Sequence, residues 1–232
     1  MAQDKNVKNE NENERWKIES PHLIICEGRD DEGYLLSYLK NIKMDEKFQV
    51  KNCKGKDKIP SFIKGLENAV GFKDLKSLII IRDADEKPKE AIDSIKNALG
   101  DKRDKGDKRD KNRFAVPSKP CEVAIPKEEE RKVKVGYALF PKFNSEDTPG
   151  RLEDLCLSTL KESARKHEKI AVSAVEQCGK LKHPHKSKLH TCLSLTDEFV
   201  GLKIGESAKA QAFDFSATEL EPLKELLLTM LN

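Results

Sequence analysis

Three acidic side chains stand at the ends of two apolar stretches of the chain. Glu27 follows HLIIC at 22–26, and Asp83 and Asp85 follow SLIII at 77–81. If both stretches are parallel strands, their carboxyl ends meet at one edge of the sheet, where such sheets bind ligands. Asp83 and Asp85 are two residues apart, so on an extended backbone both can point towards Glu27. Three carboxylates in one small volume need a cation, and oxygen ligands select a hard ion such as Mg²⁺ or Mn²⁺.

Acidic residues after strands also have a simpler interpretation. Asp and Glu cap the helix that follows and complement the dipole of its first turn. We apply this interpretation to Asp30, Asp31 and Glu32, which directly precede a helical pattern. For the three strand-end acids we favour a metal site, because they belong to two strands that share one edge.

Strands and helices alternate along much of the chain. Each of three apolar stretches is followed by a polar turn and then by a segment with apolar residues three and four apart. The strands are expected at 22–26, 48–53 and 77–81, and the helices that follow them at 33–42, 59–70 and 89–99. This alternation predicts βαβ units, a parallel sheet and right-handed crossovers.

A fourth strand, KVKVGYALFP at 132–141, comes after a long connection and precedes a helix that starts near Gly150. Beyond residue 165 the pattern is mainly helical, and it ends in the amphipathic segment 217–232. The sequence therefore predicts an α/β fold with a parallel sheet of about four strands, flanked by helices, and a mainly helical C-terminal part.

The chain divides into three parts on composition. We predict a disordered leader at 1–20, an α/β core at 21–145 with a mobile charged loop at about 100–120, and a helical extension at 146–232 packed on the same core. The loop contains the repeat GDKRDKGDKRDK, whose opposite charges nearly cancel. We interpret it as a solvated loop rather than a tip that binds nucleic acid, because steering a polyanion needs one sign of charge.

The overall composition limits the classes of protein to which the chain can belong. The 232 residues include 44 Lys and Arg against 41 Asp and Glu, a net charge of +3. Any basic footprint for nucleic acid must therefore be local. No stretch approaches the roughly 18 apolar residues of a membrane span, and the N-terminus is polar, so we expect a cytoplasmic protein with no membrane partner. The six cysteines form no CxxC pair, which favours reduced thiols.

The acidic motifs resemble those of a known domain. CEGRDDE after the first strand, and IIIRDADE later in the chain, are similar to the motifs of the Toprim domain of topoisomerases, primases and overcoming-lysogenization-defect (OLD) nucleases. FPKFNSEDTPGRLEDL and the late lysine of HKSKLH extend the likeness to small stand-alone Toprim-related proteins close to the OLD nucleases. The resemblance covers about residues 22 to 230.

The resemblance implies a divalent-metal centre that hydrolyses phosphodiester bonds in DNA or RNA, with Mg²⁺ or Mn²⁺ as cofactor. Glu27 matches the acid of the first motif, and Asp83 and Asp85 match the acidic pair. The chain is too short for the tyrosine-bearing domain of a topoisomerase, and it lacks the template-binding modules of a primase. No Walker loop is present, so any ATPase of the OLD kind must be a separate subunit.

The resemblance also points to residues near the C-terminus. Glu153 and Asp154 of LEDL match the acids that hold a second ion in OLD-type nucleases, but they also lie where a helix's first turn favours acids. Both interpretations stay open. Lys188 matches the lysine near the scissile phosphate, where a cation stabilises developing charge. The match can slip to Lys186, and a solvated lysine is the plainer interpretation.

Two groups of lysines lie near these motifs. Lys54, Lys56 and Lys58 surround Asp57 in and beside the GKDK turn, which should share the sheet edge with the acids, so these lysines could hold a phosphate backbone. Lys186 belongs to a window, 177–196, that contains no acid. The alternative for both groups is ordinary solubilising charge.

The same window also contains potential zinc ligands. Cys178, Cys192 and three histidines are of the right types, but their spacing fits no familiar zinc motif. We expect an exposed loop there.

Two functions follow from these observations. The first is a Mg²⁺-dependent nuclease, or a nuclease subunit. The second is a non-catalytic Toprim-fold module that binds nucleic acid or a protein partner, including an effector controlled by a separate ATPase. The intact acids favour the first, whereas the near-neutral charge and few aromatic residues favour the second.

Overall fold

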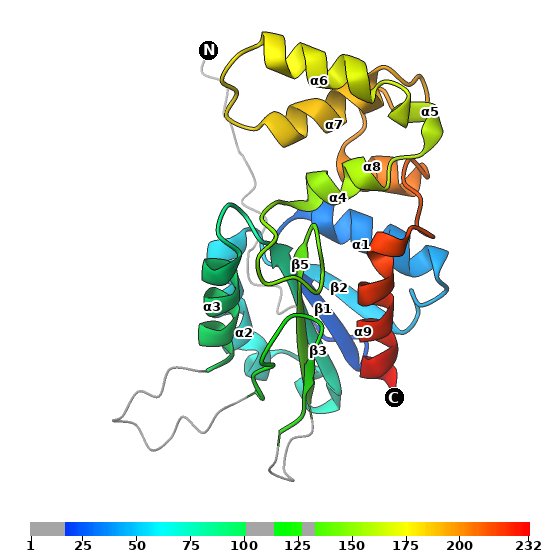
Figure 1. The fold of residues 1–232 in the computed structure, drawn as a ribbon. Coiled ribbons are helices and arrows are strands. Elements are labelled where there is room, and N and C mark those ends of the chain that lie inside the picture. Colours follow the sequence, from blue (N-terminus) through cyan, green and yellow to red (C-terminus); the bar gives the residue numbers. More distant parts are fainter. Residues whose placement is uncertain (1–16, 101–113, 127–132) are drawn as a thin grey trace, which may run out of the picture.

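The structure is a computed structural model that describes residues 17–100, 114–126 and 133–232 (Figure 1). Most of the predicted leader at 1–20, and nearly all of the charged repeat, lie outside the described residues. The last residues of the leader belong to the fold, because Ile18 is buried and Lys17 pairs with Val70. The end of the predicted mobile loop is also packed, since Phe114 is buried.

Five strands form one sheet in the order β2-β1-β3-β5-β4. Four of them are parallel: β1 (His22–Cys26), β2 (Phe48–Asn52), β3 (Ser77–Asp83) and β5 (Lys134–Phe140). The fifth, β4 (Val123–Ala124), runs antiparallel to β5 at the edge. The predicted α/β class is confirmed. The prediction of about four strands lacked β4, because two residues are too few to show a strand period.

The sheet is covered by helices on both faces. Side chains alternate along each strand, so Leu23 and Ile25 pack in one apolar cluster while Ile24 and Cys26 pack in the other. Strands buried on both sides read as continuous apolar runs, which explains HLIIC and SLIII. The helices are α1 (Arg29–Asn41), α2 (Ile59–Gly65), α3 (Pro88–Leu99), α4 (Leu152–Ser158), α5 (Glu162–Arg165), α6 (Glu168–Gln177), α7 (Pro184–Ser194), α8 (Ile204–Lys209) and α9 (Glu221–Leu231).

Different sets of helices cover the two faces of the sheet. Helices α2 and α3 cover one face, and α1, α4, α8 and α9 contribute to the cluster on the other (Figure 1). Helices α6 and α7 pack against each other beyond α4, which α7 also contacts. Among the helices that the structure describes, none is long and apolar enough to cross a membrane.

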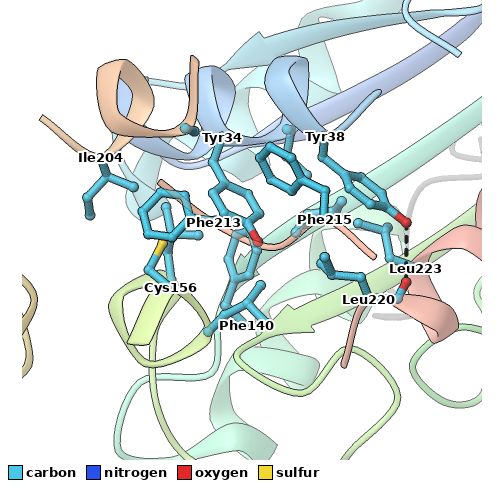
Figure 2. Packing of buried hydrophobic residues seen from close by; sticks show 14 of the residues in the cluster. Tyr34, Tyr38, Phe140, Cys156, Ile204, Phe213, Phe215, Leu220 and Leu223 are labelled. Carbon is cyan, nitrogen blue, oxygen red and sulfur yellow. Dashed lines mark hydrogen bonds between the residues drawn. The ribbon is translucent and has the colours of Figure 1, made fainter. Parts of the chain in front are cut away.

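An aromatic cluster joins the C-terminal part to the α/β core (Figure 2). Tyr34 of α1 lies with its ring centroid 5.6 Å from that of Phe213 and 5.5 Å from that of Phe215. The Tyr38 hydroxyl donates to the Leu220 carbonyl at 3.3 Å. The segment that precedes α9 is therefore part of the same core as the sheet.

The lysine- and histidine-rich segment expected to be an exposed loop is mostly the helix α7. This prediction is wrong because Leu189, Cys192 and Leu193 form a short buried stripe at helical spacing. Pro184 in the first turn suits a helix start. The many lysines and histidines around these three residues conceal the apolar period in the sequence.

Candidate functional site

The order of the strands creates a crevice between β1 and β3. The chain leaves β1 for β2 through α1, then returns across β1 to β3 through α2 on the opposite face. Such a reversal opens a ligand-binding crevice at the carboxyl ends of the two central strands. Glu27 directly follows β1 and Asp83 ends β3. The Glu27 Oε1 atom accepts a hydrogen bond from the Asp83 backbone amide at 3.3 Å, so these two predicted residues do meet.

A cavity of about 680 Å³ opens at this crevice, and we call it the carboxylate cavity. Its acidic lining residues come from β1, α1, β3, α4 and α8: Glu27, Asp30, Asp31, Asp83, Glu153 and Glu206. Its basic lining residues are Arg29, Arg151, Lys186 and Lys203. Asp30 and Glu206 accept hydrogen bonds from the backbone amides of Gly205 and Lys203 at the start of α8. The cavity is lined by more acids than bases, which suits a cationic ligand.

Three acids of the carboxylate cavity have raised pKa values. Burial raises the pKa of Asp83 to about 8, and repulsion from Asp31 and Glu27 acts in the same direction. Burial likewise raises the pKa of Asp31 to about 7. The pKa of Glu27 is raised by burial against the opposing attraction of Arg82. Near neutral pH, bound protons therefore compensate part of the negative charge in the cavity.

The metal-free protein is expected to lose stability as the pH rises towards 8. Asp31 and Asp83 bind protons more tightly in the folded than in the unfolded chain. This tighter proton binding stabilises the folded chain fully below a pH of about 4, the pKa of these groups in the unfolded chain. The contribution is lost as the pH rises through about 7 for Asp31 and about 8 for Asp83. Each of the two groups lowers the free energy of unfolding by at most about 1.4 kcal/mol per pH unit. Denaturant unfolding in EDTA at several pH values measures this pH dependence.

The matched variant for this measurement is Asp83→Asn. Its Oδ1 atom can still accept the Leu152 amide, which lies 2.9 Å from Asp83 Oδ1 in the structure. The stability difference between this variant and the original chain should grow in the variant's favour between pH 5 and about 8. A difference that does not change with pH would contradict the raised pKa of Asp83.

Asp85 lines a different cavity from the other two strand-end acids. Its Oδ2 atom is 2.7 Å from Lys56 Nζ and 3.4 Å from Arg82 Nη2, and its Oδ1 atom is 3.2 Å from Arg151 Nη2. β3 ends at Asp83, and Asp85 has a φ of 54°, so the extended backbone assumed for the pair is absent. Asp85 consequently lines a neighbouring cavity of about 590 Å³. Arg82 links the two sites, because its Nε atom is 3.2 Å from Glu27 Oε1.

Backbone hydrogen bonds fasten the start of α4 to the end of β3. Asp85 and Gly150 exchange bonds in both directions, at 2.9 and 2.8 Å. The Leu152 amide donates to Asp83 Oδ1 at 2.9 Å. These bonds bring Arg151 and Glu153 to the crevice.

The two acids of the LEDL stretch have different environments. Glu153 is buried and lines the carboxylate cavity. Asp154 Oδ2 accepts the Arg151 amide at 2.9 Å, which caps α4, and its Oδ1 atom lies 2.5 Å from His185 Nδ1. Both acids lie in the first turn of α4, as the helix interpretation expects, and only Glu153 of the two lines the carboxylate cavity.

Lys186, rather than Lys188, reaches the carboxylate cavity. The Lys186 Nζ atom is 3.3 Å from Glu153 Oε1. Lys188 lies two residues further along α7, about 200° around the helix axis, and it lines neither of the two cavities. Of the lysines around the GKDK turn, Lys56 pairs with Asp85 and lines the second cavity. Lys54 and Lys58 are exposed and line neither cavity.

Comparison with known proteins identifies the family. Residues 21–232 match the family described as "Protein of unknown function (DUF3226)". The chain belongs to this family. Among solved structures, the DUF3226 chain is similar to the hypothetical protein PH0156 from Pyrococcus horikoshii OT3, with 16% sequence identity and a TM-score of 0.50. The match covers 90% of this chain and 93% of that one, and it shows a shared fold. No curated protein matches the sequence.

Several residues that line the site in this DUF3226 chain were not predicted from the sequence, among them Asp31, Arg82 and Arg151. Asp31 was interpreted as a helix cap, and it does accept the Gly28 amide at 2.7 Å, but it also lines the carboxylate cavity. Arg82 could have been recognised from the sequence as a site residue, since an arginine inside a buried strand needs a charged partner. Arg151 carried no signal, because only the bond pattern around Gly150 brings it to Asp85.

The donor chemistry of the carboxylate cavity fits a hard dication, because its acids offer only oxygen ligands. Among the described residues, however, no group of three or more His, Cys, Asp or Glu side chains is arranged to hold a metal ion. Arg82 contacts Glu27 and Lys186 contacts Glu153, while backbone amides hold Asp31 and Asp83. An ion would therefore require these side chains to turn towards one another.

Proposed function

We propose that the protein is a cytoplasmic, divalent-metal-dependent phosphodiesterase that hydrolyses DNA or RNA, alone or as a nuclease subunit. The observation that carries this proposal is the carboxylate cavity at the switch point between β1 and β3, which is lined by more acids than bases. The resemblance of the sequence motifs to Toprim domains supports the same reaction. Any coupled ATP hydrolysis would come from a separate ATPase subunit.

Glu27, Asp83 and Glu153 are the side chains we assign to hold the ion, with Asp31 beside them. When bound, Mg²⁺ or Mn²⁺ would polarise the phosphodiester and lower the pKa of a water nucleophile. The side chains of Lys186 and Arg151 line the same cavity and would neutralise the phosphate oxygens and orient the strand. Asp85 already has three cationic partners, so we leave it out of the ion's ligands.

Mg²⁺ or Mn²⁺ is expected to stabilise the protein and to switch on cleavage. At 100 times its dissociation constant, an ion stabilises the folded state by about 2.7 kcal/mol, which raises the Tm of a chain of this size by about 5 to 10 °C. The rise should be larger at pH 8.5 than at pH 6, because the ligands must lose their protons. Thermal melts, and plasmid and RNA cleavage assays with and without EDTA, measure both effects.

The variant that tests where the ion binds is Glu153→Gln, which keeps the size of the side chain and removes its charge. The Tm rise should shrink in this variant. A rise that is the same in Glu153→Gln and Glu27→Gln as in the original chain would place the ion outside the carboxylate cavity and contradict the proposal.

A second candidate is a non-catalytic module that binds nucleic acid or a partner under the control of a separate ATPase. The observation that favours it is the lack of a ready-made group of three metal ligands among the described side chains. If this function is correct, a salt titration of nucleic-acid affinity should show weaker binding at higher salt, as phosphate contacts require, and the cleavage assays should show no cleavage in either metal.

A further inference from the structure

The second cavity, which contains Asp85, lies directly beside the carboxylate cavity. It has a volume of about 590 Å³ and is lined by the carboxyl end of β3, the GKDK turn and the start of α3. Arg151 lines both cavities, so it forms a shared wall between them. We call this second space the cation cavity because of the charges that surround Asp85.

Three cationic side chains converge on a single carboxylate in the cation cavity. Lys56, Arg82 and Arg151 each lie within 3.4 Å of an Asp85 oxygen. Glu27 is a further partner of Arg82, through the Nε atom of that side chain. Lys87 and Glu90, which also line the cavity, pair with each other at 2.6 Å. Asp57 and Glu86 are the remaining acids of the lining, which holds four acids and four bases in all. Around Asp85 itself, three cations contact only two acids.

The contacts of Asp85 are those expected for an anionic group that can be exchanged. Its backbone position is set by the two bonds to Gly150, not by its side chain. Its side chain is 22% exposed and Lys56 is 49% exposed, so both can reorganise. A phosphate offers more oxygens than a carboxylate, and guanidinium groups bind phosphate in a forked geometry. Lys56, Arg82 and Arg151 could therefore hold a phosphate where they now hold Asp85.

We propose that the cation cavity binds a second phosphate group of the substrate, next to the one in the carboxylate cavity, by displacing Asp85 from Lys56, Arg82 and Arg151. The site recognises an anionic phosphate. That phosphate is either the neighbouring phosphodiester of a nucleic-acid strand or the second phosphate of a nucleotide polyphosphate. The presence of a first phosphate in the carboxylate cavity rests on the proposed function, whereas phosphate binding in the cation cavity requires neither cleavage nor metal.

The test is phosphate binding by the full chain without metal. Pyrophosphate and the tetranucleotide dT4 are titrated calorimetrically into the protein in EDTA at low salt. Asp85→Asn should bind the better of the two probes about tenfold more tightly than the original chain, a change of about 1.4 kcal/mol. Asn is chosen because it tolerates the positive φ at this position, so the turn is preserved. Lys56→Ala should weaken binding by a similar factor.

Matched controls separate this effect from a general change in charge. Asp57→Asn removes an acid from the same cavity that is not among the contacts of the three cations, and Lys58→Ala removes an exposed lysine near Lys56. Both should change affinity by less than about twofold. Tighter binding of dT4 than of pyrophosphate assigns the phosphate to a strand, and the reverse order assigns it to a nucleotide.

The proposal is overturned if Asp85→Asn binds neither probe more tightly than Asp57→Asn does, or if Lys56→Ala binds as well as the original chain. Because the titration contains no metal and measures no cleavage, its result is independent of the nuclease assays. Phosphate binding of the expected pattern in a protein that cleaves nothing would support the cation cavity and reject the nuclease.

Discussion

Asp83→Asn is expected to reduce nucleic-acid cleavage by about 10³-fold or more and, at the same time, to stabilise the metal-free protein at pH 8. Cleavage falls because the substitution removes a charge that we assign to the ion, and losses of this order accompany the removal of one group from an electrostatic centre. Stability rises because burial and neighbouring carboxylates oppose ionisation of Asp83, whose pKa is raised to about 8. Initial rates in saturating Mg²⁺ or Mn²⁺ and denaturant unfolding in EDTA measure the two quantities.

Opposite changes in activity and stability distinguish a site residue from a structural one. The control is Asp93→Asn, which changes an exposed acid of α3 that lines neither the carboxylate cavity nor the cation cavity. It should alter neither quantity appreciably. Unimpaired cleavage by Asp83→Asn would remove Asp83 from the catalytic assignment and, with it, the central part of the proposed function.

Arg82→Met is expected to produce the largest loss of stability among these variants, about 3 kcal/mol at pH 7, which lowers the Tm by about 6 to 12 °C. The Arg82 side chain is 6% exposed and contacts both Glu27 and Asp85. Removing one member of a buried ion pair leaves the other charge without compensation. We expect the lower end of the usual range because Lys56 and Arg151 remain beside Asp85. Denaturant unfolding measures the loss.

The double variant Arg82→Met with Glu27→Gln shows whether the loss comes from the unpaired carboxylate. If it does, the second substitution recovers much of the stability, and the two effects are not additive. The loss should also shrink towards acid pH, where Glu27 becomes protonated in the single variant. Strict additivity at every pH would show that Arg82 acts through packing alone.

Much of the fold could be predicted from the sequence because its strands are buried on both faces. HLIIC and SLIII are long enough apolar runs to be recognised without a structure, and the residues just beyond each run, with Glu27 one position after the first and Asp83 two positions after the second, must lie near the sheet edge. The convergence of Glu27 and Asp83 follows from that rule alone. Strand β4 and helix α7 were not predicted, since one has two residues and the other has a short apolar stripe among many charges.

The rest of the site depends on backbone detail that periodicity does not contain. Asp85 would have faced Glu27 if the chain stayed extended beyond β3. Instead, Asp85 has a left-handed backbone conformation, and its side chain lines the next cavity. Asp31 was assigned to capping, and a residue can cap a helix and also line a cavity. The pairing of Arg82 with two acids, and the arrival of Arg151, depend on contacts between segments far apart in the sequence.

The bonds that join Gly150 and Leu152 to the end of β3 have a consequence for the surface loop before them. They anchor α4 at its first residues, independently of the path that the chain takes from β5. The tip of that path, around Glu146 and Asp147, is exposed. Insertions and substitutions at this tip should therefore leave Glu153 and Arg151 in place relative to the strands, because exposed loop tips usually tolerate such changes.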